Sequence, residues 1–547
     1  MNILLLASND LAALNSARIF KKQNFRVFNI YLTRKTPLNY SNSVFKSSFI
    51  GNPFYEYKKF KKELLNYVEN NAIKVVFPIN DIALDIIFDC KKDLNKYCQL
   101  IIPNEKAYKI ARNKLETVKL AKKLKIPVAD YIVIQNLYFP RVSYPCYLKP
   151  VSSTLINSNK CYSFDVKKVN NKSQMVGFLR ETINILPVMI QKIIEGKGVG
   201  VNVFCRKGKI ISFTVNKRIH EPLNGGGSSY RKSIEIDMTL KKYVESLVSA
   251  INLDGAMMFE FKATKKNYVL MEINPRLWGS LSLSTFSGVN FPMLMIGNSD
   301  LEFDNYKYGL YSRNLRKDIK WVFIKILKTK NIYHLLNWLL TFRRIFINKE
   351  VLDVEDINDI KPSFFQFYIL FEENLKKVLF IFHKKMLQIR GKQKQLKLKE
   401  SHKLLFVCKG NINRSAFAEN YVKNFYPKFN CDSAGSLCKR GRMTSSEGLL
   451  TAKKFNVDLN KHVSKVIYDL NINAFDKILV FDWDNYLSFL KIYPDCKHKV
   501  FLLKYKFSKY NLFVRPKEIS DPIGKSKAFY FECFKQIKYS IDKNFKV

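Results

Sequence analysis

The feature that most constrains the fold is an alternation of apolar, strand-like runs with amphipathic, helix-like runs at both ends of the chain. Near the start, the apolar runs are "NILLLAS", "RVFNIYL" and "KVVFPIN", and the helix-like runs are "LAALNSARIFKKQ" and "FKKELLNYVENN". This order is typical of a parallel sheet covered by helices. A second alternation begins at Lys403 and continues to the end of the 547 residues, so we predict several domains.

The pattern between these two ends divides the chain further. From residue 106, a helix that ends before Pro127 is followed by short strands with hairpin signals up to about residue 300. Basic, helix-like sequence then leads to a polar linker, "RGKQKQLKLKESHK". We predict a multidomain protein of α/β and α+β class. Its predicted parts are an α/β domain at 1–105, a second domain at 106–300, a basic helical connector at 301–400 and a further α/β domain at 401–547.

The charge balance is strongly basic, with 93 lysines and arginines against 46 acids and a formal net charge of +47. Such a large positive charge attracts nucleotides, phosphorylated substrates or an acidic membrane surface. The codon bias of an AT-rich genome explains the composition equally well. The segments "WVFIKIL" and "KVLFIFHKK" are basic and amphipathic, which suits either contact with a membrane surface or packed helices. The sequence has no zinc-finger spacing and no aromatic–basic RNA signature, so we do not expect specific nucleic-acid binding.

The cysteines and the apolar runs bear on the compartment. Ten cysteines are scattered without a C-x-x-C pair, which fits a reducing environment better than a disulfide framework. The start of the chain does not resemble a signal peptide, and no apolar run approaches the roughly 18 residues of a membrane span. We therefore expect a cytoplasmic protein.

Two carboxylates and an amide oxygen converge in a hairpin predicted within residues 255–281. Side chains alternate along a strand, so Glu272 and Asn274 share a face. Even pairing around the turn "ATKKN" adds Glu260 to that face. Such oxygen ligands suit Mg²⁺, and Arg276 just beyond could steady a phosphate or a carboxylate. A surface hairpin with solvated acids is the alternative.

The segments "RNKLETVKLAKKLKIP", "YLKP", "IQKIIEGKGVGV", "FEFK" and "MEINPRLWGS" occur in this order between residues 112 and 280. Together they resemble the ATP-grasp ligases, above all the carboxylate–amine ligases. The resemblance that they carry covers about residues 1–300 and implies a pre-ATP-grasp domain at 1–105 and an ATP-grasp domain at 106–300. The resemblance implies that a carboxylate is activated as an acyl phosphate, which an amine then attacks. It places Glu260, Glu272 and Asn274 at Mg²⁺. It also implies an ATP-binding set that comprises Lys114 and Lys149 at the phosphates, Gln191 and Glu195 near the adenine hinge, and Arg276 facing the acyl phosphate.

Two features depart from this family. The segment "VSSTLINSNK" after Lys149 lacks the usual glycine-bearing loop over the phosphates, so the backbone approaches a nucleotide less easily. The hinge acid, Glu195, precedes the glycine of the turn, whereas the family commonly has a glutamate after it. The glycine-rich stretch "NGGGSSYRKS" at 224–233 suggests a substrate or lid loop, with a plain flexible turn as the alternative.

A second candidate site is the stretch "FVCKGNINRS", in which Cys408 and Arg414 stand in a C-x5-R spacing. A strand that ends at Cys408 and a helix that begins near Ser415 would let the loop between them direct backbone N–H groups at a phosphate. The same field favours a nucleophilic thiolate, and Arg414 can grip two phosphate oxygens. A buried cysteine at a strand end is the alternative for the motif alone.

The ordered segments "LLFVCKGNINRSAFAE", "DSAGS", "NVDLNKHVSKVI", "FDKILVFDWDN" and "ISDPIG" resemble the low-molecular-weight protein tyrosine phosphatases over residues 402–545. The resemblance implies a four-stranded parallel sheet with flanking helices. It makes Cys408 the nucleophile, Arg414 the transition-state ligand and Asp521 the proton donor. The implied phosphate-binding residues are Lys409, Gly410, Asn411, Ile412, Asn413 and Ser415. Many relatives carry a second cysteine where Asn413 stands, so we expect phosphatase chemistry and not a redox switch.

We therefore predict a bifunctional enzyme. Its ligase half would use ATP and Mg²⁺ with a small carboxylate and an amine. Its phosphatase half would need no cofactor and would act on a phosphotyrosine protein or a phosphorylated metabolite. The alternative is a phosphatase joined to a non-catalytic half that senses ATP and docks on a membrane.

Overall fold

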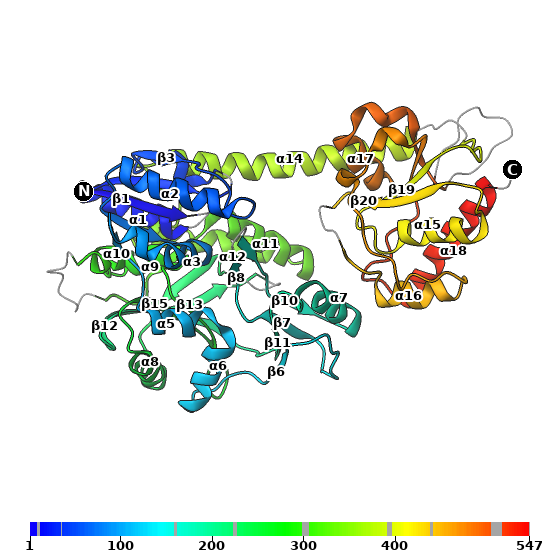
Figure 1. Ribbon diagram of the computed structural model, residues 1–547. Helices are drawn as coiled ribbons and strands as arrows, with labels where there is room; N and C mark the ends of the chain where they lie inside the picture. Colours follow the sequence, from blue (N-terminus) through cyan, green and yellow to red (C-terminus); the bar gives the residue numbers. More distant parts are fainter. Residues whose placement is uncertain are drawn as a thin grey trace. The chain divides into compact units, whose positions relative to one another are not determined.

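The computed structural model describes residues 1–547 except 8–10, 34, 158–160, 223–226, 298–305, 391–395, 438–440, 505–516 and 546–547. The first part of the predicted lid loop, 224–226, and Cys438 lie outside the described residues. The chain forms two compact units (Figure 1). The first comprises residues 1–135, 142–168 and 186–372, and the second comprises residues 136–141, 169–185 and 373–547. Among the described helices, none combines the length and the apolarity needed to cross a membrane.

The first unit begins with the parallel sheet expected from the alternating pattern. Five parallel strands pair in the order β3-β2-β1-β4-β5. They are β1 (Asn2–Ala7), β2 (Arg26–Tyr31), β3 (Lys46–Ser48), β4 (Val75–Pro78) and β5 (Gln99–Leu100), with helices α1 (Leu11–Lys22), α2 (Tyr57–Asn70), α3 (Asp81–Asp89) and α4 (Lys91–Leu94). Ile3 and Leu5 pack with α1, and Leu4 and Leu6 pack with α2, so both faces of the sheet are buried.

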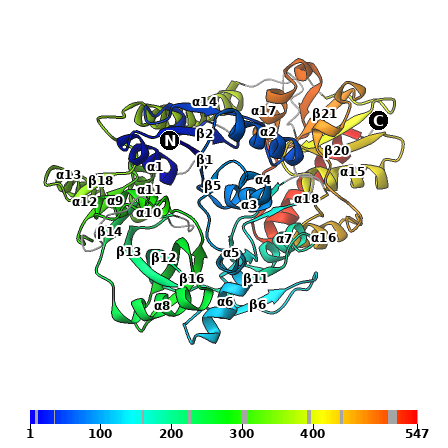
Figure 2. The ribbon, with the colours of Figure 1, turned by 60° about the vertical axis from the view of Figure 1, so that its left-hand side comes forward.

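A seven-stranded sheet follows in the order β16-β15-β12-β13-β14-β17-β18. Its strands are β12 (Lys197–Arg206), β13 (Lys209–His220), β14 (Tyr230–Ser233), β15 (Gly255–Ala263), β16 (Tyr268–Asn274), β17 (Tyr311–Arg313) and β18 (Glu350–Leu352). Helices α5 (Glu105–Arg112) and α8 (Met238–Ile251) cover one face (Figure 2). Helices α9 (Leu281–Phe286) and α10 (Phe291–Met295) pack on the other face.

A smaller four-stranded sheet pairs in the order β10-β7-β11-β6. Its strands are β6 (Tyr131–Ile134), β7 (Cys146–Pro150), β10 (Lys167–Val169) and β11 (Val188–Lys192). The glycine-free segment after Lys149 contributes β8 (Thr154–Ile156), which pairs antiparallel with β9 (Cys161–Ser163). Helix α6 (Lys114–Lys123) belongs to the first unit, and helix α7 (Lys172–Thr182) belongs to the second.

The segment 301–400, predicted as a helical connector, differs from that prediction at two strands. It contains helices α11 (Leu315–Thr329), α12 (Tyr333–Thr341), α13 (Arg343–Phe346) and α14 (Lys361–Arg390). Strands β17 and β18 also lie in it, and they extend the seven-stranded sheet. Each strand has only three residues, and buried Arg313 and Glu350 occupy positions where a strand pattern requires apolar side chains.

The second unit contains a parallel sheet in the order β20-β19-β21-β22, which confirms the predicted four strands. The strands are β19 (Leu404–Cys408), β20 (Cys431–Gly435), β21 (Lys477–Val480) and β22 (Val500–Leu502). The flanking helices are α15 (Arg414–Phe425), α16 (Ser446–Lys453), α17 (Trp483–Ile492) and α18 (Lys527–Phe545). Two apolar clusters cover the two faces of the sheet, and the loop 409–413 follows the carboxyl end of central strand β19.

Candidate functional site

Cys408 lies buried at the carboxyl end of β19, at the base of the loop that leads into α15. The backbone N–H of Asn411 donates to the Cys408 Sγ at 3.2 Å, and the Ser415 Oγ lies 3.1 Å from the same sulfur. The start of a helix and an inward N–H group therefore both face the thiol. This arrangement favours an anion, either a thiolate or a bound phosphate.

Asn411 braces the loop with its own side chain. Its φ of 50° lies in the left-handed region, which asparagine tolerates better than most residues. The Asn411 Nδ2 donates to the Ser415 Oγ at 2.9 Å and to the Ser433 Oγ at 2.6 Å. The Asn411 Oδ1 accepts from the backbone N–H of Lys465 at 2.7 Å. These hydrogen bonds of the Asn411 side chain stabilise the curved conformation of the loop.

Arg414 extends from the first turn of α15 and is buried beside two carboxylates. Its Nη1 donates to Asp482 Oδ2 at 2.5 Å and to the Ile519 carbonyl at 2.9 Å, and its Nη2 lies 2.8 Å from Asp521 Oδ2. Burial opposes the charged guanidinium, but Asp482, Asp521 and Cys408 outweigh it and raise the pKa of Arg414 above its ordinary value. Arg414 is therefore a fixed cation, and the structure brings it together with Cys408 and Asp521.

The remaining predicted loop residues take different positions. Lys409 is exposed, whereas Gly410 is buried and Ile412 is partly buried. Asn413 is turned toward α16 and α18, where its Oδ1 accepts from the Ser445 Oγ at 2.8 Å and its Nδ2 lies 3.5 Å from the Tyr530 hydroxyl. The side chain of Asn413 therefore connects the loop to α16 and α18.

Sequence reasoning missed three residues that hold this loop from a distance. Asp482 caps the start of α17 and orients Arg414. The His462 Nε2 lies 2.8 Å from the Asn411 carbonyl oxygen, and the Arg442 Nη2 donates to the Gly410 carbonyl at 2.7 Å. Only Asp482 offered a local signal, because an aspartate between a buried strand and a helix belongs at the carboxyl edge of a parallel sheet.

The predicted carboxylate cluster forms in the first unit. Glu260 pairs with Glu272 across β15 and β16, and the Asn274 Nδ2 donates to Glu260 Oε1 at 3.3 Å. The Lys114 Nζ lies 3.3 Å from Glu272 Oε1, and the Arg218 Nη2 lies 2.6 Å from Glu260 Oε2. Arg218, on β13, is a cation that the sequence reasoning missed. Two carboxylates, an amide and two cations are thus concentrated at one point of the sheet.

Lys149 and Gln191 lie buried on neighbouring strands β7 and β11. Burial lowers the pKa of Lys149, although Glu272 and Glu260 partly offset this effect. Among the residues that the structure describes, neither the nitrogen nor the oxygen of the Gln191 amide has a hydrogen-bond partner. Buried polar atoms are normally paired, so this amide fits the edge of a bound base. Glu195 is exposed in the turn between β11 and β12.

Arg276 connects this cluster to the N-terminal sheet. Its Nε lies 2.8 Å from Asp81 Oδ1 at the start of α3, and its Nη2 donates to the Asn274 Oδ1 at 3.4 Å. Burial opposes the charge of Asp81, but Arg276 and Arg112 hold the pKa of its carboxyl well below the usual range. Asp81 and Arg112, which the sequence reasoning did not single out, therefore fix Arg276 beside the carboxylates.

The donor set of the cluster fits Mg²⁺. In the described part of the chain, no group of three His, Cys, Asp or Glu residues could hold a metal ion. The set formed by Glu260, Glu272 and Asn274 supplies only two carboxylates and an amide. Mg²⁺ usually takes one or two protein carboxylates and completes its shell with water and substrate phosphates, so such a sparse set suits it.

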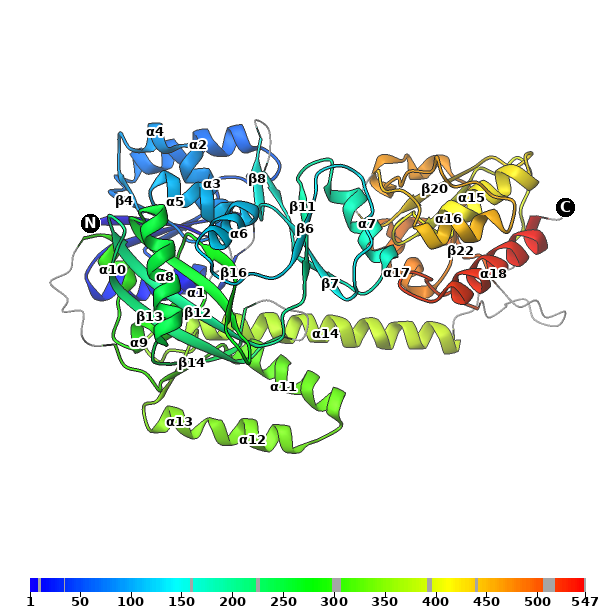
Figure 3. The ribbon, with the colours of Figure 1, turned by 90° about the horizontal axis from the view of Figure 1, so that it is seen from below.

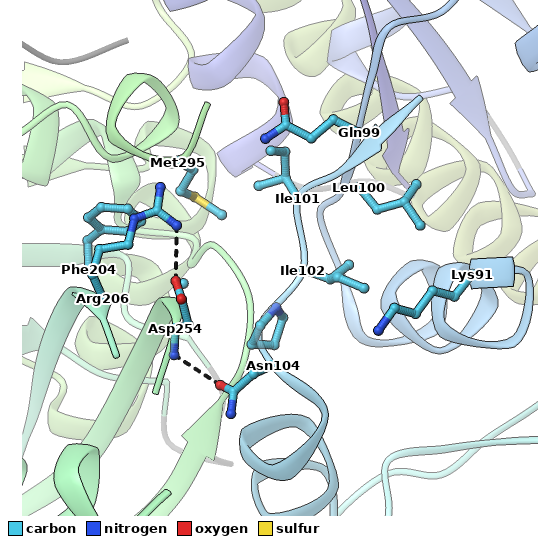
Figure 4. A pocket seen from close by; sticks show the side chains of 12 residues that line it. Lys91, Gln99, Leu100, Ile101, Ile102, Asn104, Phe204, Arg206, Asp254 and Met295 are labelled. Carbon is cyan, nitrogen blue, oxygen red and sulfur yellow. Dashed lines mark hydrogen bonds and ion pairs between the residues drawn. The ribbon is translucent and has the colours of Figure 1, made fainter. Parts of the chain in front are cut away.

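A separate pocket lies where β5 meets the ends of β12 and β15 (Figure 4). Its volume is about 330 Å³, and its lining includes Lys91, Phe204, Arg206 and Asp254. Arg206 Nη1 pairs with Asp254 Oδ1 at 3.0 Å at one wall. None of the sequence-predicted site residues lines this pocket, so it is distinct from both candidate sites.

Comparisons with known proteins fall into two parts that match the two sites. The family "Low molecular weight phosphotyrosine protein phosphatase" matches residues 403–546, and "ATP-grasp in the biosynthetic pathway with Ter operon" matches residues 184–308. The low molecular weight protein-tyrosine-phosphatase Ptp of Acinetobacter johnsonii is 29% identical over 129 residues, which are 24% of this chain and 85% of that protein.

The carbamoyl phosphate synthase large chain of Clostridium acetobutylicum is 24% identical over 232 residues, which are 40% of this chain and 21% of that protein. Among solved structures, an L-amino acid ligase from Bacillus licheniformis aligns with a TM-score of 0.46 and 14% identity, over 57% of this chain and 78% of that one. The chain thus joins an ATP-grasp domain to a low molecular weight phosphotyrosine protein phosphatase domain.

Proposed function

We propose that the second unit hydrolyses phosphomonoesters, phosphotyrosine among them, through a phosphocysteine intermediate. The observation that carries this proposal is the grouping of Cys408, Arg414 and Asp521 around one loop. Ser415 and the Asn411 N–H lie within 3.2 Å of the Cys408 sulfur, and Arg414 lies 2.8 Å from Asp521. These groups supply a nucleophile, a cation for the phosphoryl oxygens and a proton carrier.

The proposed reaction has two steps. The Cys408 thiolate attacks phosphorus, and the bond to the leaving oxygen breaks as Asp521 gives that oxygen its proton. Asp521 then takes a proton from water, whose oxygen attacks phosphorus and breaks the S–P bond to release orthophosphate. Arg414 binds the phosphoryl oxygens in both steps. The Arg414 guanidinium, which contacts Asp521 in the structure, therefore contacts the phosphate once the phosphate is bound. No step needs a cofactor.

Hydrolysis of p-nitrophenyl phosphate tests this proposal. Cys408→Ser should reduce kcat on the order of 10³-fold or more, because the nucleophile is lost. Cys431→Ser is the matched control, since it changes a second buried cysteine on the neighbouring strand. Burial raises the pKa of Cys431 to about 12, which makes that thiol unreactive, so the control should retain activity. Equal rates for wild type and Cys408→Ser would refute the phosphatase assignment.

We propose that the first unit is an ATP-dependent ligase that joins a small carboxylate to an amine through an acyl phosphate. The support for this proposal is the cluster of Glu260, Glu272 and Asn274 with Lys114 and Arg218 around it. Lys114 and Lys149 would bind the ATP phosphates, and Gln191 the adenine. Glu195, which is exposed in the turn after β11, would lie near the base.

In this proposal, Arg276 holds the acyl phosphate, because Asp81 and Arg112 fix its guanidinium beside the carboxylates. Glu260, Glu272 and Asn274 would hold Mg²⁺, which neutralises phosphate charge when it is bound. The chain's own residues then act by positioning and by electrostatic stabilisation rather than by covalent chemistry.

ADP release in the presence of candidate carboxylates and amines tests the ligase proposal. Glu272→Ala should lower the substrate-dependent rate about 100-fold and weaken its Mg²⁺ dependence. Glu245→Ala is the control, because Glu245 is an exposed acid on α8 that lies 4.0 Å from Lys241. A chelator should abolish ADP release and leave phosphatase activity intact. Unchanged nucleotide binding and Mg²⁺ dependence in Glu272→Ala would show that the metal assignment is wrong.

A further inference from the structure

Helix α12, with the sequence "YHLLNWLLT", is apolar, yet none of its residues is buried. It contacts α11, and Figure 3 shows α11, α12 and α13 extending away from the sheet that precedes them. An apolar helix in a globular protein normally turns its leucines toward a core. The exposed leucines of α12 point to solvent instead, and this orientation needs a specific cause.

A buried ionic network anchors the inner side of α12. Arg313 is fully buried and pairs with Asp318 and Glu350, each at 2.6 Å. The Trp338 Nε1 donates to Asp318 Oδ2 at 2.7 Å, and the Arg313 Nη2 donates to the Thr341 Oγ1 at 2.6 Å. These bonds fix the rotation of α12 about its axis. The polar contacts face inward, and the leucine stripe faces outward.

The helices before and after α12 also carry exposed large apolar side chains. Leu327 is 79% exposed and Phe346 is 89% exposed. The apolar face consists of Phe323, Ile324 and Leu327 from α11, Ile332 before α12, Tyr333, Leu336, Leu339 and Leu340 from α12, Phe346 from α13 and Ile347 after it. Many exposed large apolar side chains on three successive helices are typical of an interaction site.

The charges around this apolar face have one sign. Residues 315–349 contain nine lysines and arginines and one acid, Asp318. Asp318 is buried in the network with Arg313, so it adds no negative charge to the surface. An apolar helix face with aromatic residues and basic neighbours is the composition of helices that lie in the interface of an anionic bilayer.

We propose that α11, α12 and α13 dock the protein on the surface of a membrane that contains anionic phospholipids. The apolar face would enter the headgroup boundary, and the long stems of Lys325, Lys328 and Lys330 would carry their ammonium groups to lipid phosphates. A second copy is a poorer occupant, because two faces of the same strong positive charge repel each other.

Flotation of the full chain with lipid vesicles tests this proposal. We expect binding to vesicles of phosphatidylcholine mixed with phosphatidylglycerol, little binding to phosphatidylcholine alone, and weaker binding as salt increases. Leu336→Glu with Leu340→Glu should weaken binding roughly tenfold or more. The matched control is Leu137→Glu with Ile185→Glu, since Leu137 and Leu336 are both 52% exposed and Leu137 lies outside the apolar face.

A second pair of variants separates charge from apolar contact. Lys325→Glu with Lys328→Glu should abolish the preference for anionic vesicles while p-nitrophenyl phosphate hydrolysis stays unchanged. The proposal is overturned if the leucine pair binds anionic vesicles like wild type, or if neutral vesicles bind equally well. It is also overturned if the leucine pair abolishes self-association in solution and no vesicle binding is seen, because a second copy would then be the occupant.

Discussion

Gly435 shows how closely β20 approaches the loop 409–413 that follows Cys408. A Cβ at this position would lie 2.9 Å from the Gly410 carbonyl carbon and 3.1 Å from the Asn411 nitrogen. Both neighbours are backbone atoms of the loop, so they cannot move aside without displacing the Asn411 N–H that donates to Cys408. Small displacements of a catalytic loop are costly, since about 1 Å can reduce a rate about 100-fold.

We therefore expect Gly435→Ala to lower kcat/KM for p-nitrophenyl phosphate by about 10- to 100-fold. Gly441→Ala is the matched control. At Gly441 a Cβ meets no atom within 4 Å, but φ is +69°, so the variant introduces backbone strain without pushing the loop. A Gly435→Ala enzyme with wild-type kcat/KM would contradict the steric argument.

Glu355 gives the first unit a pH-dependent stability. Burial raises the pKa of Glu355 from 4.5 to about 7, and Asp353 adds to this shift. The folded state therefore keeps a proton that the unfolded chain releases, so stability falls as pH rises from about 4.5 through about 7. Glu355→Gln should remove this slope and stabilise the protein at pH above about 7 by roughly 1–3 kcal/mol. Urea unfolding across this pH range measures both effects, and an unchanged slope would exclude this role for Glu355.

The residues of the phosphatase site divide by how the sequence encodes them. Cys408 and Arg414 lie at the two ends of one loop. Their spacing suggested a phosphate cradle, with a buried cysteine at a strand end as the alternative, and the ordered segments that follow favoured the cradle. Asp482 and His462 reach the same loop only because β21 and the segment before it pack beside β19. Contacts that depend on how the strands pack leave little trace in local sequence, so His462 was not predictable. Asp482 offered only its position between a buried strand and a helix.

At the level of elements, the hairpin of β15 and β16 was predictable and the pair β17 and β18 was not. The hairpin has two long alternating strands around a polar turn, and its pairing places Glu260 opposite Glu272 as expected. Strands β17 and β18 have three residues each and carry a buried ion pair, Arg313 with Glu350. A strand held by buried charge shows no apolar periodicity, so its sequence looks like a connector.

That buried network yields a prediction about stability. Arg313→Met leaves Asp318 and Glu350 as buried acids without their shared cation, which should destabilise the first unit by about 3–5 kcal/mol. Arg206→Met is the control, because the pair of Arg206 with Asp254 is largely exposed and should contribute less than about 1 kcal/mol. Urea unfolding of both variants measures the difference. Equal losses would show that burial does not decide the strength of the Arg313 pairs.

For the whole molecule, the separation of the hydrophobic cores is the decisive feature. Within the described part of the chain, five clusters of buried apolar residues are found, and each cluster lies within one of the two compact units. Cooperative unfolding follows from a shared core, so two units with separate cores are expected to unfold as separate transitions. The ligands proposed for the two domains differ, which makes it possible to assign each transition.

Calorimetry of the full chain should therefore show two unfolding transitions. A ligand that binds only the folded state stabilises its own domain by about 2.7 kcal/mol at a 100-fold excess over its Kd. ATP with Mg²⁺ should raise the Tm of the first unit alone, and inorganic phosphate should raise the Tm of the second unit alone. Glu272→Ala should remove the first shift and Arg414→Ala the second. A single transition, or one ligand moving both transitions, would show that the two units are energetically coupled despite their separate cores.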